Sequence, residues 1–129
     1  MIRKAIQTDL PAIKKIIDDA AKIHRILPRS KKEIKQVIES FFVNEENGKI
    51  IGCCGLEIYN KKIAEIRSLV VMEGYREKGI GKKLIEACLK KAKEKNIYEV
   101  LSITDKVNFF KKCGFDTCLN DQYAMFIHP

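Results

Sequence analysis

Residues 71–84 read VMEGYREKGIGKKL, and this stretch decides the fold. The apolar run that ends at Val71 predicts a strand, and the glycines at 74, 79 and 81 predict a tight turn. A helical pattern follows at once, because apolar side chains recur on one side of the next segment; they are Ile80, Leu84, Ile85, Cys88, Leu89 and Ala92. The stretch therefore predicts a strand, a glycine turn and a helix start in immediate succession.

This arrangement is typical of an anion-binding site. Backbone N–H groups at the start of a helix point toward a bound anion, and the helix dipole favours negative charge there. Glycine has no Cβ, so the backbone can approach a ligand closely. Cationic side chains gather at the same end of the segment; they are Arg76, Lys78, Lys82 and Lys83. We therefore expect a phosphate or pyrophosphate ligand at this turn.

The composition predicts one globular domain spanning residues 1–129. Hydrophobic residues make up 46% of the chain and charged residues 33%, as in an ordinary soluble protein. No apolar run approaches the ~20 residues of a membrane span, and the first residues lack the apolar segment of a secretion signal. We therefore expect a cytoplasmic location and no membrane partner.

The net charge of +8 allows three interpretations. Nucleic-acid binding is one, but no recognition motif or aromatic stacking platform accompanies the charge, so we expect no nucleic-acid partner. A small polyanionic ligand is the second. The third is a solvated, lysine-rich surface, and it accounts for most of the lysines, including Lys90, Lys91, Lys93 and Lys95. Only the charges at the glycine turn call for a ligand.

The cysteines and histidines do not predict a metal site. The five cysteines have no C-x-x-C spacing, and the chain has only two histidines, His24 and His128. An odd number of cysteines without a framework spacing suits a reducing compartment, where most thiols act as small core side chains.

The rest of the pattern predicts an α/β domain with seven strands and four helices. We expect strands at residues 2–6, 41–46, 50–59, 63–71, 98–104, 115–118 and 123–127. We expect helices from Asp9 to about His24, from Ser30 to about Ile38, from Gly79 to Lys95 and from Asp105 to Lys112. Asn47-Gly48 is a strong hairpin turn, and glycines at 52 and 55 suggest a bulge in the third strand.

These motifs resemble the GNAT superfamily of acetyl-CoA-dependent N-acetyltransferases. The family motif Arg/Gln-x-x-Gly-x-Gly/Ala after a strand corresponds to Arg76–Gly81, and residues 109–115 resemble the family's short helix that ends in Gly-Phe. A lone G-x-G motif is weak, but this one has the required strand–turn–helix context. The resemblance implies a mixed, mostly antiparallel sheet of about seven strands, splayed between strands 4 and 5, with four helices.

The resemblance also implies where acetyl-CoA binds. The pyrophosphate would bind the backbone of the glycine turn, through Arg76, Glu77, Lys78, Gly79, Ile80, Gly81 and Lys82. The pantetheine arm would lie along the fourth strand, on backbone groups of Leu69 and Val71. The neighbouring amide of Val70 would polarise the thioester carbonyl. No metal is expected in this chemistry.

An amine acceptor needs a proton acceptor, because an α-amine with a pKa near ~8 is mostly protonated at pH 7. We assign this role to Glu65, which lies on the fourth strand where many family members carry a catalytic carboxylate. A charged residue within an apolar strand also calls for a reason. The alternative is a water-facing position at the mouth of the sheet. Many members supply a general acid from a tyrosine where this chain has Phe110, so we assign no acid.

A narrower resemblance is to the acetyltransferase domain of N-acetylglutamate synthases. It rests on residues 27–30, residues 52–56 and especially residues 65–71, which read EIRSLVV. It implies a small amino acid as acceptor, with glutamate first, and arginines to bind its carboxylates. Arg67 shares a strand face with Glu65, and Arg29 lies in a loop that borders the acceptor pocket in this fold.

Other functions stay open on the sequence alone. A solvated charge is the alternative for Arg29, and a structural role is the alternative for Arg67. The acceptor could instead be a protein or a polyamine, and the chain could be a non-catalytic acyl-CoA sensor. Homodimers are common in the family, so a homodimer is a further partner that the resemblance allows.

Overall fold

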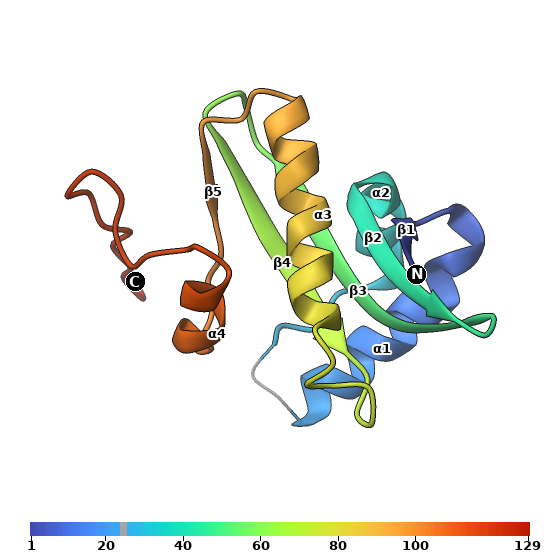
Figure 1. Cartoon of the computed structure of the whole chain (residues 1–129). Coiled ribbons are helices and arrows are strands. Elements are labelled where there is room, and N and C mark those ends of the chain that lie inside the picture. The colour runs from blue at the N-terminus through green and yellow to red at the C-terminus, as the bar shows by residue number, and fades with distance from the viewer. Residues whose placement is uncertain (24–25) are drawn as a thin grey trace.

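The glycine turn separates strand β4 (Ile63–Val71) from helix α3 (Ile80–Glu94), as the sequence predicts. The computed structural model describes residues 1–23 and 26–129 (Figure 1). Gly79 is the N-cap of α3 and adopts the left-handed conformation, with φ of 79°. Glycine reaches this conformation without strain, which explains the residue type at this position.

A five-stranded mixed sheet forms the centre of the molecule, in the order β1-β2-β3-β4-β5. The other strands are β1 (Ile2–Lys4), β2 (Phe41–Glu46), β3 (Lys49–Ile58) and β5 (Glu99–Leu101). The first four strands are antiparallel, and β5 runs parallel to β4 through the α3 crossover. The β2–β3 hairpin turns at Asn47-Gly48, where both residues have positive φ, as predicted.

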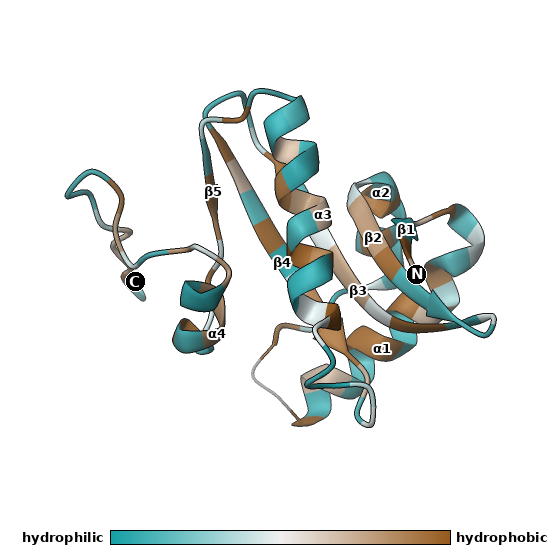
Figure 2. Ribbon diagram, viewed as in Figure 1, coloured by the Kyte–Doolittle hydropathy of each residue, from teal (hydrophilic) through white to brown (hydrophobic). Residues whose placement is uncertain are grey.

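Helices cover both faces of this sheet and create two cores. Helices α1 (Leu10–Ile23) and α2 (Lys31–Gln36) pack on one face, together with the short 3-10 helices at Gln7–Asp9 and Ile38–Ser40. Helices α3 and α4 (Val107–Lys112) pack on the other. Cys53 and Cys54 show the alternation, because the first belongs to the α1 core and the second to the α3 core. Figure 2 shows the apolar sides of α1 and α3 turned toward the sheet.

Strands β4 and β5 pair over only three residues before they part. The parallel pairs are Ile63↔Glu99, Ala64↔Val100 and Glu65↔Leu101. Beyond them the Ser102 hydroxyl donates a hydrogen bond to the Ile66 carbonyl over 3.1 Å. Figure 1 shows β4 and β5 diverging from there. The predicted splay between strands 4 and 5 is therefore present, and it opens directly after Glu65.

A bulge in β4 follows the start of this splay. The β3–β4 register shifts between Cys53 and Gly55, and the extra residue lies on β4. The bend or bulge predicted in the third strand is found against β2 instead, where Asn44 pairs with Gly52 but Glu45 pairs with Ile50. On β4 the shift coincides with Ser68, whose φ is 57°. A non-glycine residue in this region is strained and is found at functional sites. The bulge interrupts the alternation of β4. Side chains and backbone groups after Ser68 therefore point to the opposite side from the one that an unbroken strand would give.

The prediction of about seven strands is wrong. Residues 115–118 and 123–127 do not form the expected final hairpin, and the residues between them form only an isolated bridge, Leu119 with Gln122. The turn itself forms, because Asn120 and Asp121 both adopt positive φ. The flanking side chains bury no face, however, since Phe126 is 72% exposed and Ile127 is 90% exposed. A two-stranded hairpin without a buried face is only marginally stable.

The helix predictions are confirmed with small changes at their ends. Ser30 and Glu33 form the predicted capping box of α2. The predicted end of the first helix at His24 lies outside the described residues. Helix α4 begins at Val107 rather than near Asp105, because the Thr104 hydroxyl accepts a hydrogen bond from the Lys106 amide in a local turn. No helix in residues 1–23 and 26–129 is long and apolar enough to cross a membrane.

Candidate active site

A cleft of about 880 Å³ lies where β4 and β5 part. It extends from Glu65 along β4 to the glycine turn, and its far wall comes from residues 102–106 and from α4. The end of α1 and the segment after it supply Ala20, Ile23, Ile26 and Leu27. The splay of the sheet therefore places a strand edge, a helix N-terminus and several charged side chains in one cavity.

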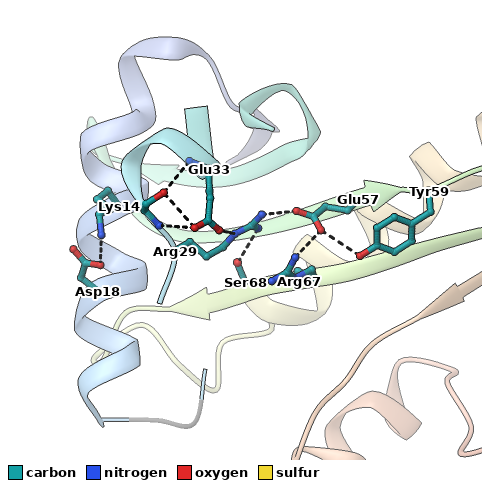
Figure 3. A network of polar contacts seen from close by, with 9 residues as sticks. Lys14, Asp18, Arg29, Glu33, Glu57, Tyr59, Arg67 and Ser68 are labelled. Atoms are coloured by element: carbon teal, nitrogen blue, oxygen red, sulfur yellow. Dashed lines mark hydrogen bonds and ion pairs between the residues drawn. The ribbon is translucent and has the colours of Figure 1, made fainter. Parts of the chain in front are cut away.

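The polar residues of the cleft lie on the sheet face that α1 and α2 cover. Glu65 and Arg67 are two residues apart on β4, so their side chains share this face. Glu57 on β3 pairs directly with Glu65 across the two strands. Two carboxylates at opposed positions repel each other unless cations or hydrogen-bond donors compensate. Here two arginines and a tyrosine provide this compensation (Figure 3).

Glu57 binds both arginines, one with each oxygen. Arg29 Nη2 donates to Glu57 Oε1 over 2.5 Å, and Arg67 Nη1 donates to Glu57 Oε2 over 2.9 Å. The side chain of Glu57 is 11% exposed and that of Arg29 is 5% exposed, so this ion pair is largely shielded from water. Arg67 is 32% exposed and lines the cleft. Such charge-assisted bonds are among the stronger hydrogen bonds in proteins.

Arg29 is held in place by further contacts. Its Nη1 lies 3.4 Å from the hydroxyl of Ser68, the residue at the β4 bulge. Its Nε lies 3.9 Å from Glu33 Oε2 and is buried without a hydrogen-bond partner. Neither Arg29 nor Glu57 belongs to the cleft lining, although both contact residues that do, Ser68 and Arg67. The guanidinium therefore connects the loop before α2 with both β3 and β4.

The arginines control the protonation of Glu57. Burial alone would raise the pKa of this carboxyl, but hydrogen bonds from Arg29 and then Arg67 lower it below its ordinary value. The same contact with Glu57 raises the pKa of the Arg67 guanidinium against the opposing effect of burial. Glu57 is therefore a stable carboxylate near neutral pH, and both arginines are charged.

Tyr59 connects this ion pair to Glu65. Its hydroxyl lies 2.6 Å from Glu65 Oε1 and 3.4 Å from Glu57 Oε2. Partial burial and the Glu65 hydrogen bond raise the pKa of Tyr59 to about 12, so the hydroxyl stays protonated and donates to the carboxylate. Tyr59 thus fixes the side chain of Glu65 at the edge of the cleft.

The glycine turn closes the other end of the cleft. Gly74, Glu77 and Gly79 all have positive φ, and such a turn gathers backbone N–H groups around a concavity. A Cβ at Gly81 would lie 3.2 Å from the ring of Phe109, so α4 packs directly on the first turn of α3. The Nε of Arg76 donates to the Val71 carbonyl over 3.0 Å. Lys78 lies outside the cleft lining, 5.7 Å from the centre of the Tyr75 ring.

The backbone of β4 presents alternate residues to the cleft. The Met72 amide donates to Ile51 on β3, and the Val70 amide interacts with the buried thiol of Cys53. Strand alternation therefore directs the amides of Leu69 and Val71 away from β3, toward the edge that borders the cleft. Burial of the Cys53 thiol raises its pKa to about 12, so it remains a protonated core side chain.

Phe110, at the position of the family's tyrosine, is a core residue. It is buried, and its ring makes edge-to-face contacts with Phe109 and Phe115. It lines the cleft without any proton to donate. Among the residues that the structure describes, no group of three His, Cys, Asp or Glu side chains is placed to hold a metal ion.

Most of the residues singled out in the sequence lie around the one cleft, and two functional candidates were missed. The cleft is lined by Glu65, Arg67, Leu69, Val70, Val71, Arg76, Glu77, Gly79, Ile80, Gly81 and Lys82. Arg29 and Lys78 lie outside the lining. Glu57 and Tyr59 are the residues that sequence reasoning missed. The tight turn after Tyr59 sets the β3–β4 register, so counting across it from Glu65 leads to Glu57.

Comparisons with known proteins agree with this geometry. The model of the family described as Acetyltransferase (GNAT) family matches residues 10–115. The chain is 40% identical, over 88% of its length and 74% of the relative, to the uncharacterized N-acetyltransferase CT2212 of Chlorobaculum tepidum. It is 29% identical, over 89% of its length and 67% of the relative, to the amino-acid acetyltransferase of Mycobacterium tuberculosis.

A solved structure extends the comparison to a complex with ligands. The N-acetylglutamate synthase of Neisseria gonorrhoeae, complexed with coenzyme A and N-acetyl-glutamate, superposes with a TM-score of 0.85 at 26% identity. The match covers 95% of this chain but only 29% of the synthase chain. The similarity therefore concerns one domain of that larger protein.

The lowered pKa of Glu57 predicts a pH-dependent contribution to stability. A carboxyl whose pKa is lower in the folded than in the unfolded state stabilises the fold above its ordinary value of about 4.3, and this contribution is lost as pH falls through the folded value. We expect the Tm difference between the wild type and Glu57→Gln to be constant from pH 7 to about pH 5 and to shrink below about pH 4. Thermal unfolding followed by circular dichroism measures it. A difference that persists unchanged to pH 3 would contradict the ion-pair assignment.

Proposed function

The chain belongs to the GNAT acetyltransferase family and is an acetyl-CoA-dependent N-acetyltransferase, and we propose that its acceptor is the α-amine of a small amino acid. Glutamate is the first acceptor that we propose. The observation that supports this most is the presence of Glu65 and Arg67 side by side in the cleft, on the face of β4 that α1 covers. One group accepts a proton from an amine, and the other binds a carboxylate. Relatives named amino-acid acetyltransferase and N-acetylglutamate synthase add support.

The residues of the cleft fit acetyl-CoA as the donor. The turn before α3 offers backbone N–H groups, a helix N-terminus and Lys82 for the pyrophosphate. The amides of Leu69 and Val71 face the open edge of β4, where the amides of the pantetheine arm can pair as an added strand would. Leu69, Val70 and Val71 also supply an apolar surface. Acetyl-CoA brings the activated acetyl group as a thioester.

The proposed reaction is a direct attack of the amine on this thioester. Glu65 accepts the proton of the acceptor ammonium, directly or through water, and the free amine attacks the acetyl carbonyl. The amide that we propose for the developing oxyanion is that of Val70, between the two residues that bind the pantetheine arm. The same amide lies close to the Cys53 thiol in this structure. The nitrogen then loses its second proton to solvent, the C–S bond breaks and the thiolate of coenzyme A leaves, and solvent supplies the thiolate's proton, since Phe110 has none to give.

Arg67 orients the acceptor in this proposal. Its side chain is anchored through Nη1 to Glu57 and reaches the cleft two residues from Glu65. An α-carboxylate bound there would bring the α-amine close to the carboxylate of Glu65, because the two groups share one carbon in an α-amino acid. The planar guanidinium suits a carboxylate better than a lysine ammonium does, because it offers two parallel donors.

We expect Glu65→Gln to lower kcat about 10²- to 10³-fold at neutral pH, the usual contribution of a general base. The affinity for acetyl-CoA should stay near that of the wild type, because Glu65 lies at the end of the cleft away from the glycine turn. Release of coenzyme A thiol measures kcat, and calorimetry measures the affinity. Turnover by the variant at the wild-type rate with a good acceptor would exclude Glu65 as the base.

The acceptor class can be identified with a panel of amines: glutamate, glutamine, aspartate, lysine, spermidine and a peptide N-terminus. We expect the α-amino acids to cause release of coenzyme A thiol. Arg67→Ala should raise KM for them about tenfold, since a charge-assisted bond is lost. KM for an acceptor without a carboxylate should change little. An equal loss across all acceptors would identify Arg67 as a structural residue. If the wild type binds acetyl-CoA but acetylates no amine of the panel, the chain is a non-catalytic acyl-CoA sensor.

A further inference from the structure

Glu57 accepts hydrogen bonds from the two arginines of the site, which are the groups that could otherwise bind a carboxylate of the acceptor. One oxygen accepts from Arg29 Nη2 and the other from Arg67 Nη1. An amino-acid acceptor therefore finds Arg67 already bound in part to Glu57. The other cationic side chains of the lining belong to the glycine turn, to α3 and to the far wall; they are Arg76, Lys82 and Lys106. Arg29 is 5% exposed and lies outside the lining.

The charges around the acceptor end of the cleft are balanced. Arg29 and Arg67 carry two positive charges, and Glu57 and Glu65 carry two negative charges. Glu33 adds a third carboxylate 3.9 Å from Arg29, but it is exposed and therefore screened by water. A zwitterionic amino acid leaves this balance intact, whereas a second carboxylate adds a negative charge next to two carboxylates. Like charges at such a site cost binding affinity.

The described part of the α1 wall offers this second carboxylate no compensation. It consists of the apolar residues Ala20, Ile23, Ile26 and Leu27. Glu57 is also fixed in place, because each of its oxygens accepts a hydrogen bond from an arginine. Its charge is therefore a permanent feature of the site near neutral pH.

We propose that Glu57 is a specificity-determining residue of the acceptor site, which acts as an internal carboxylate on Arg29 and Arg67 and disfavours an acceptor with a second carboxylate. The inference rests on the proposed function, since it concerns an amino acid bound at Arg67, and it narrows that function: glutamate, proposed first, is expected to be a weaker acceptor than glutamine. Glutamate and glutamine are the discriminating pair, because they have the same shape and differ by one charge. Removing the charge of Glu57 leaves the site with one net positive charge and favours the dicarboxylate.

The test compares kcat/KM for glutamate and glutamine in the wild type, in Glu57→Gln and in Glu33→Gln. We expect the glutamate-to-glutamine ratio to rise about tenfold or more in Glu57→Gln, because a close like charge is removed. Glu33→Gln is the matched control, since it removes a carboxylate near the same Arg29 but at an exposed position; its ratio should change less than threefold. An unchanged ratio in Glu57→Gln, or an equal rise in both variants, overturns the proposal.

A second variant covers the case in which Glu57→Gln does not fold. Arg29→Gln leaves the charge of Glu57 opposed by Arg67 alone, so the glutamate-to-glutamine ratio should fall. A ratio that stays constant or rises in Arg29→Gln contradicts the proposal.

Binding separates this inference from the proposed function. If the wild type releases no thiol with any amino acid, the proposed function fails, but Kd for glutamate and glutamine can still be measured by calorimetry on the protein saturated with coenzyme A. The same rise in selectivity for glutamate in Glu57→Gln then supports the role of Glu57. A failure of both amino acids to bind the wild type and the variant overturns it.

Discussion

The parting of β4 and β5 after the Glu65–Leu101 pair is the constraint on which the site depends. Three residues of parallel pairing hold the two strands together, and the next residues of β4 keep one edge unpaired. Unpaired strand edges are usually covered or blunted, but here the edge borders a cleft of about 880 Å³. The α3 crossover that makes β5 parallel also brings the glycine turn to the far end of this edge. One topological feature therefore supplies a binding edge, a helix N-terminus and the space between them.

Electrostatics organise the acceptor end of the same cleft. Two arginines and two glutamates from separate parts of the chain form one network beside the bulge at Ser68, and Tyr59 lies between the two carboxylates. Each buried charge has an opposite charge or a donor close by, which is the condition for keeping charges in a shielded site. The exception is Nε of Arg29, which is buried without a hydrogen-bond partner. The arginine is nevertheless firmly held, because three elements meet at its guanidinium.

Local patterns in the sequence predict the strand and the helix that carry the site. They do not predict structure that depends on contacts between residues far apart in the chain. The strand at 63–71 and the helix from Gly79 follow from hydrophobic periodicity and glycine placement, and both form as predicted. The hairpin expected at 115–127 has the right turn residues but buries no face, which no local pattern reveals. The role of Arg29 at the acceptor stays a prediction, and its ion pair with Glu57 could not be seen locally, because that partner comes from a strand 28 residues further along the chain. Glu57 and Tyr59 could have been found from the sequence. The tight turn between β3 and β4 fixes their register, and that register places Glu57 opposite Glu65.

The most direct test of the central claim is amide hydrogen exchange with and without acetyl-CoA, measured residue by residue. The claim is that the donor lies along the open edge of β4 and ends at the glycine turn. Exchange at Leu69 and Val71 and at residues 79–82 should slow when acetyl-CoA is added, while exchange at the exposed C-terminal segment stays the same. Binding of acetyl-CoA that protects other parts of the chain and leaves the β4 edge unchanged would contradict the account.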